Sequence, residues 1–276
     1  MPFAVDPART LVMGILNVTP DSFSDGGAFL DPGQALAQAE AMLAAGADLL
    51  DVGGESTRPF AAPVAADQEL ARVLPVIEAI RARWPIPLSV DTRKAMVAEA
   101  ALAAGADLVN DVSALTHDPA MVEVVRRWQV PVVLMHMQGR PETMQLAPAY
   151  GDVVAEVKAF LAERIAWAQA QGIPRQHLIV DPGIGFGKTV EHNLALLRGL
   201  PQLRELGCPV LVGHSRKAFL GKVLGIERPA DRDLATAAVS ALCAAAGVAV
   251  VRVHDVAATA QAVRIARAIT GAHPQP

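Results

Sequence analysis

Short apolar runs, many with β-branched residues, alternate along the chain with longer amphipathic segments that are rich in alanine. The apolar runs predict strands at Leu11–Leu16, Asp48–Val52, Pro87–Val90, Leu108–Asn110, Val130–Met135, Leu178–Val180, Val210–Gly213 and Val248–Val251. The amphipathic segments predict helices at Gln34–Ala45, Glu69–Arg83, Ala95–Ala104, Pro119–Arg127, Val153–Gln171, Val190–Arg198, Leu234–Ala246 and Ala257–Ile269. Continuously apolar strands that alternate with helices are typical of a parallel sheet covered by those helices.

Eight strand–helix pairs within 276 residues match the arithmetic of a (β/α)8 TIM barrel. We therefore predict an α/β fold in which residues 1–276 form a single barrel domain. A doubly wound open sheet contains the same local units, so the barrel prediction depends on the count of eight. No shift in composition and no Ser/Pro-rich linker divides the chain.

The composition excludes several classes of protein. With 52% hydrophobic residues the chain can bury a large core, which excludes intrinsic disorder. A net charge of −4 and only 4% aromatic residues do not form the basic, stacking surface that nucleic acids require. No apolar run reaches the roughly 18 residues that span a bilayer, and the N-terminus does not have the pattern of a signal peptide. Cys208 and Cys243 are isolated, as is typical of reduced thiols, so we predict a cytoplasmic protein without nucleic-acid or membrane partners.

Polar and charged residues follow almost every predicted strand. They lie in the segments 17–27, 53–59, 91–94, 110–113, 135–137, 181–188, 213–217 and 252–255. The carboxyl ends of barrel strands meet at one mouth, where barrel enzymes carry their active sites. This concentration of acids, amides and cations predicts an enzyme whose site lies at that mouth.

The polar residues also indicate a kind of ligand. Asp91, Asn110 and Asp181 lie at or just past apolar strands, where buried polar groups need partners. A flat heterocycle with amide-like and guanidine-like edges supplies such partners, because a carboxylate accepts two parallel N–H bonds well. Arg252 and His254 follow the last predicted strand, close to where many barrels bind phosphate. The predicted ligand is a planar polar ring together with an anion.

Each of these residues also has an ordinary structural explanation. Asp91 can be the N-cap of the helix that follows it, and Asp181 can belong to a simple turn. Lys217 can be a solvated cation, and His254, like His136, can be a buried histidine with satisfied hydrogen bonds. Their joint occurrence at one barrel mouth favours function for Asp91, Asp181, Lys217 and Arg252, but not for His136.

Seven motifs occur in order along the chain: MGILNVTPDSFSDGG, DVGGESTRP, SVDTRK, NDVSAL, DPGIGFGK, GHSRK and RVHDV. In these motifs the chain resembles the dihydropteroate synthases, a family of pterin-binding enzymes, from near its first residue to near its last. The resemblance implies a cytoplasmic transferase of the folate pathway on a (β/α)8 barrel. It also implies a homodimer, for which the alanine-rich outer faces of Leu234–Ala246 and Ala257–Ile269 are candidate surfaces. The implied reaction joins 6-hydroxymethyl-7,8-dihydropterin diphosphate to 4-aminobenzoate and releases diphosphate and 7,8-dihydropteroate.

The resemblance also implies roles for individual positions of this sequence. The implied pterin-binding residues are Asp91, Asn110, Asp181 and Lys217. The implied residues for diphosphate and other anions are Asn17, Thr57, Arg58, Arg252 and His254, of which Asn17 also meets Mg2+. The implied aminobenzoate residues are Phe23, Arg58, Pro59 and Phe186. The implied catalytic set is Asn17, Asp91, Asp181, Lys217, Arg252 and His254, whereas Lys188 is given no role.

These residue types suit the dissociative, SN1-like displacement that the resemblance implies at the pterin methylene. Mg2+ and fixed cations neutralise the charge that develops on the departing diphosphate. Buried carboxylate and amide groups that hold the ring can stabilise a transient cation at the methylene carbon. The aniline nitrogen then attacks directly, so the mechanism needs no nucleophilic side chain and depends on positioning and electrostatics.

Two positions depart from the family's common pattern. Phe60 follows Pro59 where relatives commonly have glycine. Ala218 follows Lys217 where many relatives have a serine whose hydroxyl can meet the benzoate carboxylate. Both departures concern aminobenzoate binding and leave the expected pterin site unaffected.

Two other functions are compatible with a pterin-binding barrel. A methyltransferase that uses methyltetrahydrofolate and a corrinoid protein would share the pterin carboxylates, but it would not need Asn17, the SRK turn and the RVHDV anion site together. A non-catalytic pterin-binding paralogue, acting as a partner subunit, would be expected to have changed at Asn17, Arg58, Lys217 or Arg252. All four residues are present.

Overall fold

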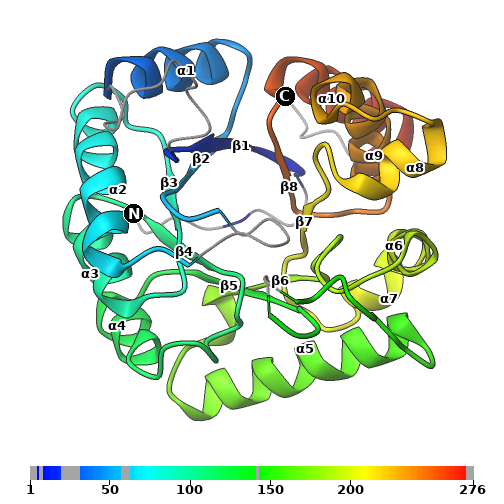
Figure 1. Cartoon of the computed structure of the whole chain (residues 1–276), viewed down its shortest axis with the longest axis horizontal. Coiled ribbons are helices and arrows are strands. Elements are labelled where there is room, and N and C mark those ends of the chain that lie inside the picture. The colour runs from blue at the N-terminus through cyan, green and yellow to red at the C-terminus, as the bar shows by residue number, and fades with distance from the viewer. Residues whose placement is uncertain (1–4, 6–8, 20–31, 57–62, 141–142, 272–276) are drawn as a thin grey trace.

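The computed structural model describes residue 5 and residues 9–19, 32–56, 63–140 and 143–271. In this part of the chain eight parallel strands form one sheet in the order β6-β5-β4-β3-β2-β1-β8-β7. The strands are β1 (Leu11–Asn17), β2 (Leu49–Gly53), β3 (Leu88–Asp91), β4 (Leu108–Asp111), β5 (Val132–Met135), β6 (Leu178–Asp181), β7 (Leu211–Gly213) and β8 (Val250–Val253). The two ends of this order meet where Val180 of β6 forms a parallel bridge with Val210. The sheet closes into a barrel (Figure 1), which confirms the predicted (β/α)8 TIM fold.

Helices surround the barrel and connect its strands (Figure 1). They are α1 (Pro32–Ala44), α2 (Ala66–Arg81), α3 (Ala95–Ala103), α4 (Met121–Trp128), α5 (Val153–Ala170), α6 (Val190–Arg198), α7 (Leu200–Arg204), α8 (Ala218–Leu224), α9 (Asp233–Ala245) and α10 (Val256–Thr270). The short helices α7 and α8 and the 3-10 turns η2 (Arg175–His177) and η3 (Pro229–Arg232) were not predicted. Segments of one or two turns are too short to show a helical period in the sequence. No helix in the described part of the chain is long and apolar enough to cross a membrane.

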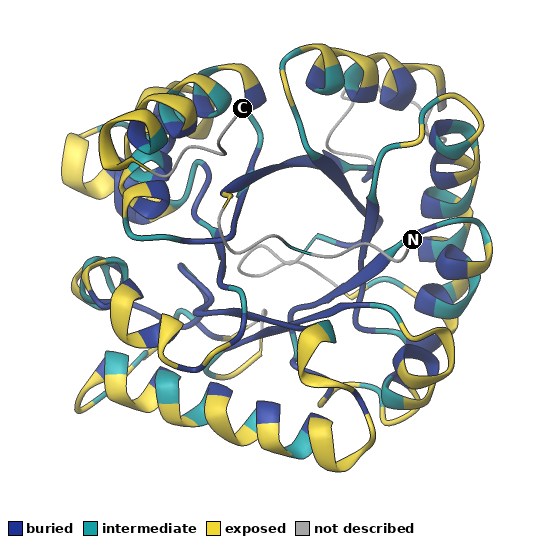
Figure 2. Ribbon diagram, turned by 180° about the vertical axis from the view of Figure 1, so that it is seen from behind, coloured by how far each residue is buried: buried dark blue, intermediate teal, exposed yellow. Residues whose placement is uncertain are grey.

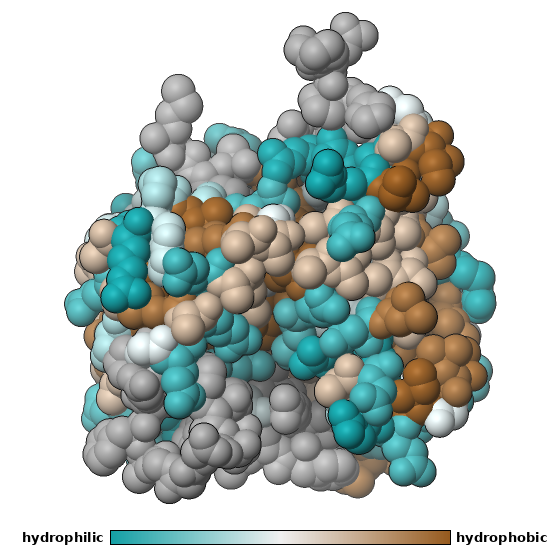
Figure 3. All heavy atoms as spheres, turned by 90° about the horizontal axis from the view of Figure 1, so that it is seen from above, coloured by the Kyte–Doolittle hydropathy of each residue, from teal (hydrophilic) through white to brown (hydrophobic). Residues whose placement is uncertain are grey.

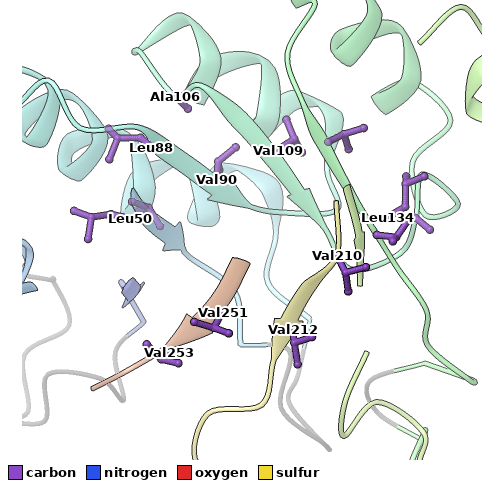
Figure 4. Close-up of a cluster of buried hydrophobic side chains, with 14 of the residues drawn as sticks. Leu50, Leu88, Val90, Ala106, Val109, Leu134, Val210, Val212, Val251 and Val253 are labelled. Atoms are coloured by element: carbon purple, nitrogen blue, oxygen red, sulfur yellow. The ribbon is translucent and has the colours of Figure 1, made fainter. Parts of the chain in front are cut away.

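Apolar side chains form two separate layers around the barrel wall. Outward-facing strand residues such as Leu50, Val90 and Val109 pack against the helices (Figure 4). Inward-facing residues such as Met13 and Leu49 fill the amino-terminal half of the barrel interior. Figure 2 shows the same division, because the strands are buried along almost their whole length whereas the helices are buried mainly on their inner faces. The two layers account for strands that are apolar on both faces.

The polar site lies directly above the inner apolar layer. Side chains alternate between the two faces of a strand, so an inward-facing residue is followed by another two positions later. Such inward pairs are Leu49 and Asp51 in β2, Leu108 and Asn110 in β4, Ile179 and Asp181 in β6, and Val250 and Arg252 in β8. Strand geometry therefore stacks a polar layer on an apolar one toward the carboxyl end of the barrel.

Two expectations about the ends of elements are wrong. β8 runs from Val250 to Val253 and not from Val248 to Val251, so Arg252 lies inside the strand and not after it. Val248 instead donates its N–H to the Cys243 carbonyl over 3.0 Å, at the end of α9. The alternative role of Asp91 as a helix N-cap is also wrong, because Asp91 ends β3 and Lys94 precedes α3.

Candidate active site

A network of charged and amide side chains crosses the barrel interior. Arg252 of β8 donates from Nε to Asp51 Oδ2 over 2.5 Å and from a terminal nitrogen to Asp91 Oδ2 over 2.7 Å. Asn110 of β4 donates from Nδ2 to the same Asp51 oxygen over 3.1 Å. Asp51, Asp91 and Asn110 are all buried. Four strands thus hold one ion-paired cluster, and removing one partner from such a buried cluster is strongly destabilising.

The protonation of Asp91 depends mainly on its burial. Burial raises the pKa of Asp91 from 3.8 to about 7, against the attraction of Arg252. Asp51 adds to the rise, because two carboxylates that share one guanidinium repel each other. Asp91 can therefore hold a proton close to neutral pH. A ligand that offers N–H groups favours the ionised form, which accepts two hydrogen bonds.

Asp181 and Lys217 form a second part of the same mouth. The Gly183 N–H donates to Asp181 Oδ1 over 2.7 Å, and Lys217 Nζ donates to the Ile184 carbonyl over 2.6 Å. The Lys217 ammonium also lies 4.0 Å from the centre of the Phe186 ring. Burial raises the pKa of Asp181 to about 6 and lowers the pKa of Lys217 to about 7, although each charge opposes the other's shift. The alternative role of Lys217 as a solvated cation is therefore wrong.

The loop after β6 needs glycine at three positions, of which Gly183 and Gly185 shape the site and Gly187 lies against Gln138. Gly183 and Gly185 have φ angles of 66° and 81°, which side chains of the L series rarely adopt. A Cβ on Gly183 would lie 1.9 Å from the carbonyl oxygen of His136, and a Cβ on Gly185 would lie 2.7 Å from Cδ of Lys217. The glycines let the loop pack directly against the end of β5 and against Lys217. Asp181 therefore begins a loop with a specific position, and not a generic turn.

The ends of β7 and β8 bring the predicted anion-binding residues next to Asp181. Ser215 Oγ lies 2.9 Å from Nδ1 of His254 and accepts the His254 backbone N–H over 3.1 Å. A Cβ on Gly213 would lie 3.9 Å from both Cδ of Arg252 and Oδ2 of Asp181. Arg252 and Asp181 thus both lie against the backbone at position 213.

Asn17 reaches the same group from β1. It pairs in register with Gly53 of β2, which in turn pairs with Asp91 of β3. A Cβ on Gly53 would lie 3.4 Å from Cβ of Asp91 and 3.8 Å from Oδ1 of Asn17. The structure therefore brings together the members of the predicted pterin and anion sets that it describes: Asn17, Asp91, Asn110, Asp181, Lys217, Arg252 and His254.

Part of the predicted site lies outside the described residues. These positions are Phe23, Thr57, Arg58, Pro59 and Phe60. Of the aminobenzoate set the structure describes Phe186, which is buried in a cluster with Val112, Met135 and Met144. This cluster forms an apolar wall beside the Lys217 ammonium. Ala218 is the first residue of α8 and is exposed.

Two residues of the site, Asp51 and Ser215, were not predicted. Asp51 is the partner of both Arg252 and Asn110. Its signal in the sequence is a single carboxylate within the otherwise apolar strand LLDVG, since a buried charge needs a partner. Ser215 lies inside the GHSRK motif, where its hydroxyl contacts His254.

Known proteins resemble this chain over almost its whole length. A family model described as pterin binding enzyme matches residues 13–254. The dihydropteroate synthase of Synechocystis sp. is 48% identical over 261 residues, which cover 95% of this chain and 90% of that protein. The chain belongs to the dihydropteroate synthase family.

Solved structures of the dihydropteroate synthase family share the fold. A structure of the Xanthomonas albilineans enzyme with 4-aminobenzoic acid has a TM-score of 0.91 and 48% identity, and the match covers 99% of this chain and 100% of that one. A structure of the same enzyme in complex with 7,8-dihydropteroate has a TM-score of 0.88 and 47% identity, covering 98% and 97%. The predicted fold, family and enzyme class are confirmed, whereas the roles of single residues stay predictions.

Proposed function

We propose that this protein joins 6-hydroxymethyl-7,8-dihydropterin diphosphate to 4-aminobenzoate and releases diphosphate and 7,8-dihydropteroate. The observation that carries the proposal is the buried cluster of Asp91, Asn110 and Arg252 beside Asp181. A pterin ring has a guanidine-like edge whose parallel N–H groups suit a carboxylate, and its carbonyl and ring nitrogens suit amide and ammonium donors. Asn110 and Lys217 supply such donors at the same mouth. The names of the relatives and the ligands in their structures point to the same substrates.

The leaving diphosphate is best accommodated by Arg252, within β8, and by His254, which follows that strand. Arg252 binds Asp51 and Asp91 through Nε and one terminal nitrogen, so its second terminal nitrogen can face an anion. His254, two residues after Arg252, is half-buried and lies beside Ser215. Hydrogen-bond donors that are fixed in advance stabilise charge as it develops in the transition state.

We include Mg2+ in the proposal as an ion that arrives with the diphosphate. Within the residues that the structure describes, no three His, Cys, Asp or Glu side chains are grouped so as to hold a metal. Mg2+ that bridges substrate phosphates needs only one or two protein ligands. The side-chain oxygen of Asn17, at the end of β1, fits that requirement. When bound, the ion neutralises charge on the leaving group.

Bond changes at the pterin methylene complete the proposed mechanism. The C–O bond to diphosphate breaks first, and its electron pair leaves with the diphosphate. The ionised carboxylates of Asp91 and Asp181 stabilise the resulting cation through the ring that they hold. The nitrogen of 4-aminobenzoate then forms the C–N bond and releases one proton to solvent. Phe186, in the apolar wall beside Lys217, covers the aminobenzoate ring in this arrangement.

We propose in addition that two copies of the chain associate through α9 and α10. The large apolar residues exposed on these helices are Leu234 at 83%, Leu242 at 69%, Ile265 at 63% and Ile269 at 80%. The face on which α9 and α10 lie carries grouped hydrophobic side chains (Figure 3). Large exposed apolar patches are typical of interfaces, so this surface supports the homodimer. We expect the enzyme to act in the cytoplasm, where its two free cysteines stay reduced.

The test of the proposed reaction is a direct assay. Purified protein, Mg2+, the pterin diphosphate and 4-aminobenzoate are expected to give 7,8-dihydropteroate and diphosphate in equal amounts. Asp181→Ala is expected to lose pterin diphosphate binding while the fold persists, and Asp231→Ala, on the exposed turn η3, is the matched control. Methyl transfer from methyltetrahydrofolate to a corrinoid protein would favour the methyltransferase, and pterin binding without any turnover would favour the non-catalytic paralogue.

A further inference from the structure

Lys188 is a buried cation to which the proposed reaction gives no role. The residue is 3% exposed, and its Nζ donates to the Phe186 carbonyl over 2.9 Å. The same nitrogen lies 3.0 Å from Nδ1 of His136 and 3.4 Å from the His136 carbonyl oxygen. Lys188 thus connects the loop after β6 to the end of β5.

The hydrogen-bond partners of Lys188 are fixed, neutral acceptors, while the charges of Asp181 and Lys217 act on it from further away. Burial lowers the pKa of His136 to about 3, so the ring is neutral at physiological pH. Nδ1 accepts a hydrogen bond when Nε2 carries the ring proton. The His136 ring also packs edge-on against Phe160, with 4.9 Å between ring centres and 88° between ring planes. Burying an ammonium group is costly, so three acceptors held in place are the compensation that keeps it there.

The loop that Lys188 joins is held at four successive carbonyl groups. The carbonyls of residues 184–187 each accept a hydrogen bond from a side chain outside that segment. In chain order the donors are Lys217, Gln145, Lys188 and Tyr150. The Gly185 N–H is in turn bound by Asn193 Oδ1 over 2.7 Å. Residues 181–188 are buried apart from the half-buried Gly185, so these side chains supply the hydrogen bonds that water supplies to the carbonyls of an exposed loop.

Two of these donors bind the peptide groups on either side of the Gly187 Cα. Lys188 binds the Phe186 carbonyl, and the Tyr150 hydroxyl donates to the Gly187 carbonyl over 2.9 Å. Burial raises the pKa of Tyr150 to about 12, so its hydroxyl remains a donor at any physiological pH. The hydrogen bond from Lys217 lies two residues before Phe186, at the Ile184 carbonyl, and the bonds at Gly185 separate it from Phe186. A change at Lys188 or Tyr150 therefore acts first on Phe186.

We propose that Lys188 is a positioning residue that fixes the Phe186 ring for 4-aminobenzoate, with Tyr150 in the same role on the next carbonyl. The proposal rests on the proposed contact between Phe186 and aminobenzoate. Without the ammonium group, the Phe186 carbonyl and His136 Nδ1 lose their buried donor, and the ring loses its fixed place in the apolar wall. The pterin residues Asp91 and Asn110 lie on strands that this loop does not hold.

The first test compares Lys188→Met with Lys158→Met, a lysine on α5 that pairs with Glu205 at the surface. The loss of one buried charged hydrogen bond is expected to raise the KM for 4-aminobenzoate about tenfold in Lys188→Met. The KM for the pterin diphosphate is expected to change less than about threefold, and Lys158→Met is expected to change neither. An unchanged aminobenzoate KM in folded Lys188→Met would overturn the proposal.

A double-mutant cycle with Phe186→Leu separates positioning from a general structural role. If Lys188 acts through Phe186, adding Lys188→Met to Phe186→Leu changes the aminobenzoate KM by less than about twofold. Full additivity of the two changes would contradict the proposal. A Phe186→Leu variant with a normal aminobenzoate KM would instead show that the assigned contact of Phe186 is wrong, and the proposal would fall with that contact while the synthase assay stays positive.

Two further measurements keep the proposal testable if Lys188→Met does not fold. Tyr150→Phe removes one hydroxyl at a half-buried position and is expected to raise the aminobenzoate KM about threefold, again only when Phe186 is present. Hydrogen exchange of the Phe186 amide, which donates to the Gly183 carbonyl over 3.0 Å, is expected to be about tenfold faster in either variant. Unchanged exchange and unchanged KM in Tyr150→Phe would overturn the proposal without reference to Lys188→Met.

Discussion

The strands and the loop after β6 hold buried cations in two different ways. In the strands, Arg252 pairs with the carboxylates of Asp51 and Asp91, so each charge meets an opposite charge. At the loop, Lys188 from within it and Lys217 from the turn after β7 donate to the loop's backbone carbonyls, which carry only partial charge. Burial lowers the pKa of both lysines to about 7. Burial acts on Arg252 as well, but Asp51 and Asp91 outweigh it and raise its pKa.

The difference shows what each region can contribute to a reaction. The strand network has a spacing set by the register of four strands, and its guanidinium stays charged although burial raises the pKa of Asp91 to about 7. The loop depends on glycine conformations and on bonds from side chains to the backbone, and its charges titrate close to neutral pH. A mouth built from both parts holds a ring against strand side chains whose spacing is fixed. On the loop side, the protonation of Asp181 and Lys217 can change close to neutral pH.

Arg252→Met is the change that tests the strand network most severely. It leaves Asp51 and Asp91 buried without their cation, and the expected loss is about 3–5 kcal/mol in the free energy of unfolding. We also expect kcat/KM to fall about a thousandfold or more, because the fixed donor for the leaving group is gone. Urea unfolding and steady-state kinetics measure the two effects. Arg198→Met, on the exposed side of α6, is the control, and a similarly small loss in both variants would refute the importance of the network.

The strand network also marks where prediction from the sequence succeeded and where it failed. Asp91 and Asn110 were predicted because each ends an apolar run, and a polar residue there has to find a partner. Asp51 was missed because it lies inside such a run, and only closure of the barrel brings it to Arg252, which is 201 positions away. The predicted limits of β8 were wrong because they too depend on a partner that only barrel closure supplies. Arg252 interrupts the apolar run in the sequence, yet its charge is balanced inside the barrel by Asp51 and Asp91.

The loop was predicted less completely than the strands. Phe186 in this loop and Lys217 in the turn after β7 were found through the resemblance, but Lys188 lies in the same glycine-rich turn as Phe186 and was given no role. A turn of that composition predicts exposure, whereas the structure buries Lys188 against His136. The cause is tertiary, because Gly183 allows the loop to approach the His136 carbonyl closely. No local pattern in the sequence reports such a contact.

Asp181→Asn tests whether charge on the loop side depends on pH. Burial raises the pKa of Asp181 from 3.8 to about 6, so between these values the folded protein keeps a proton that the unfolded chain has lost. Stability must then fall as the pH rises from about 4 to 6, by about 2–3 kcal/mol from this group. The facing cations Lys217, Lys188 and Arg252 keep their charge in that range.

The asparagine variant is expected to lose this fall in stability, because its side chain does not titrate. Urea unfolding at a series of pH values measures the slope for each protein. Asp231→Asn, at an exposed position of η3, is expected to keep the slope of the parent protein. Parallel curves for the parent and Asp181→Asn would mean that Asp181 ionises normally, and the contrast between the strand and loop regions would lose its main support.

Gly185→Ala is the mildest change and separates backbone strain from contact with Lys217. Gly225, at the end of α8, is the matched control: its φ is 69° against 81° at Gly185, but a Cβ there would meet nothing within 4 Å. Both substitutions are expected to lower the free energy of unfolding by about 1 kcal/mol, since alanine resists positive φ. Only Gly185→Ala places a methyl group 2.7 Å from Cδ of Lys217, which must move away. We therefore expect pterin diphosphate to bind about tenfold more weakly to Gly185→Ala and normally to Gly225→Ala, as calorimetry can measure. Equal affinities would show that Lys217 reaches the pterin without the exact loop path that glycine allows.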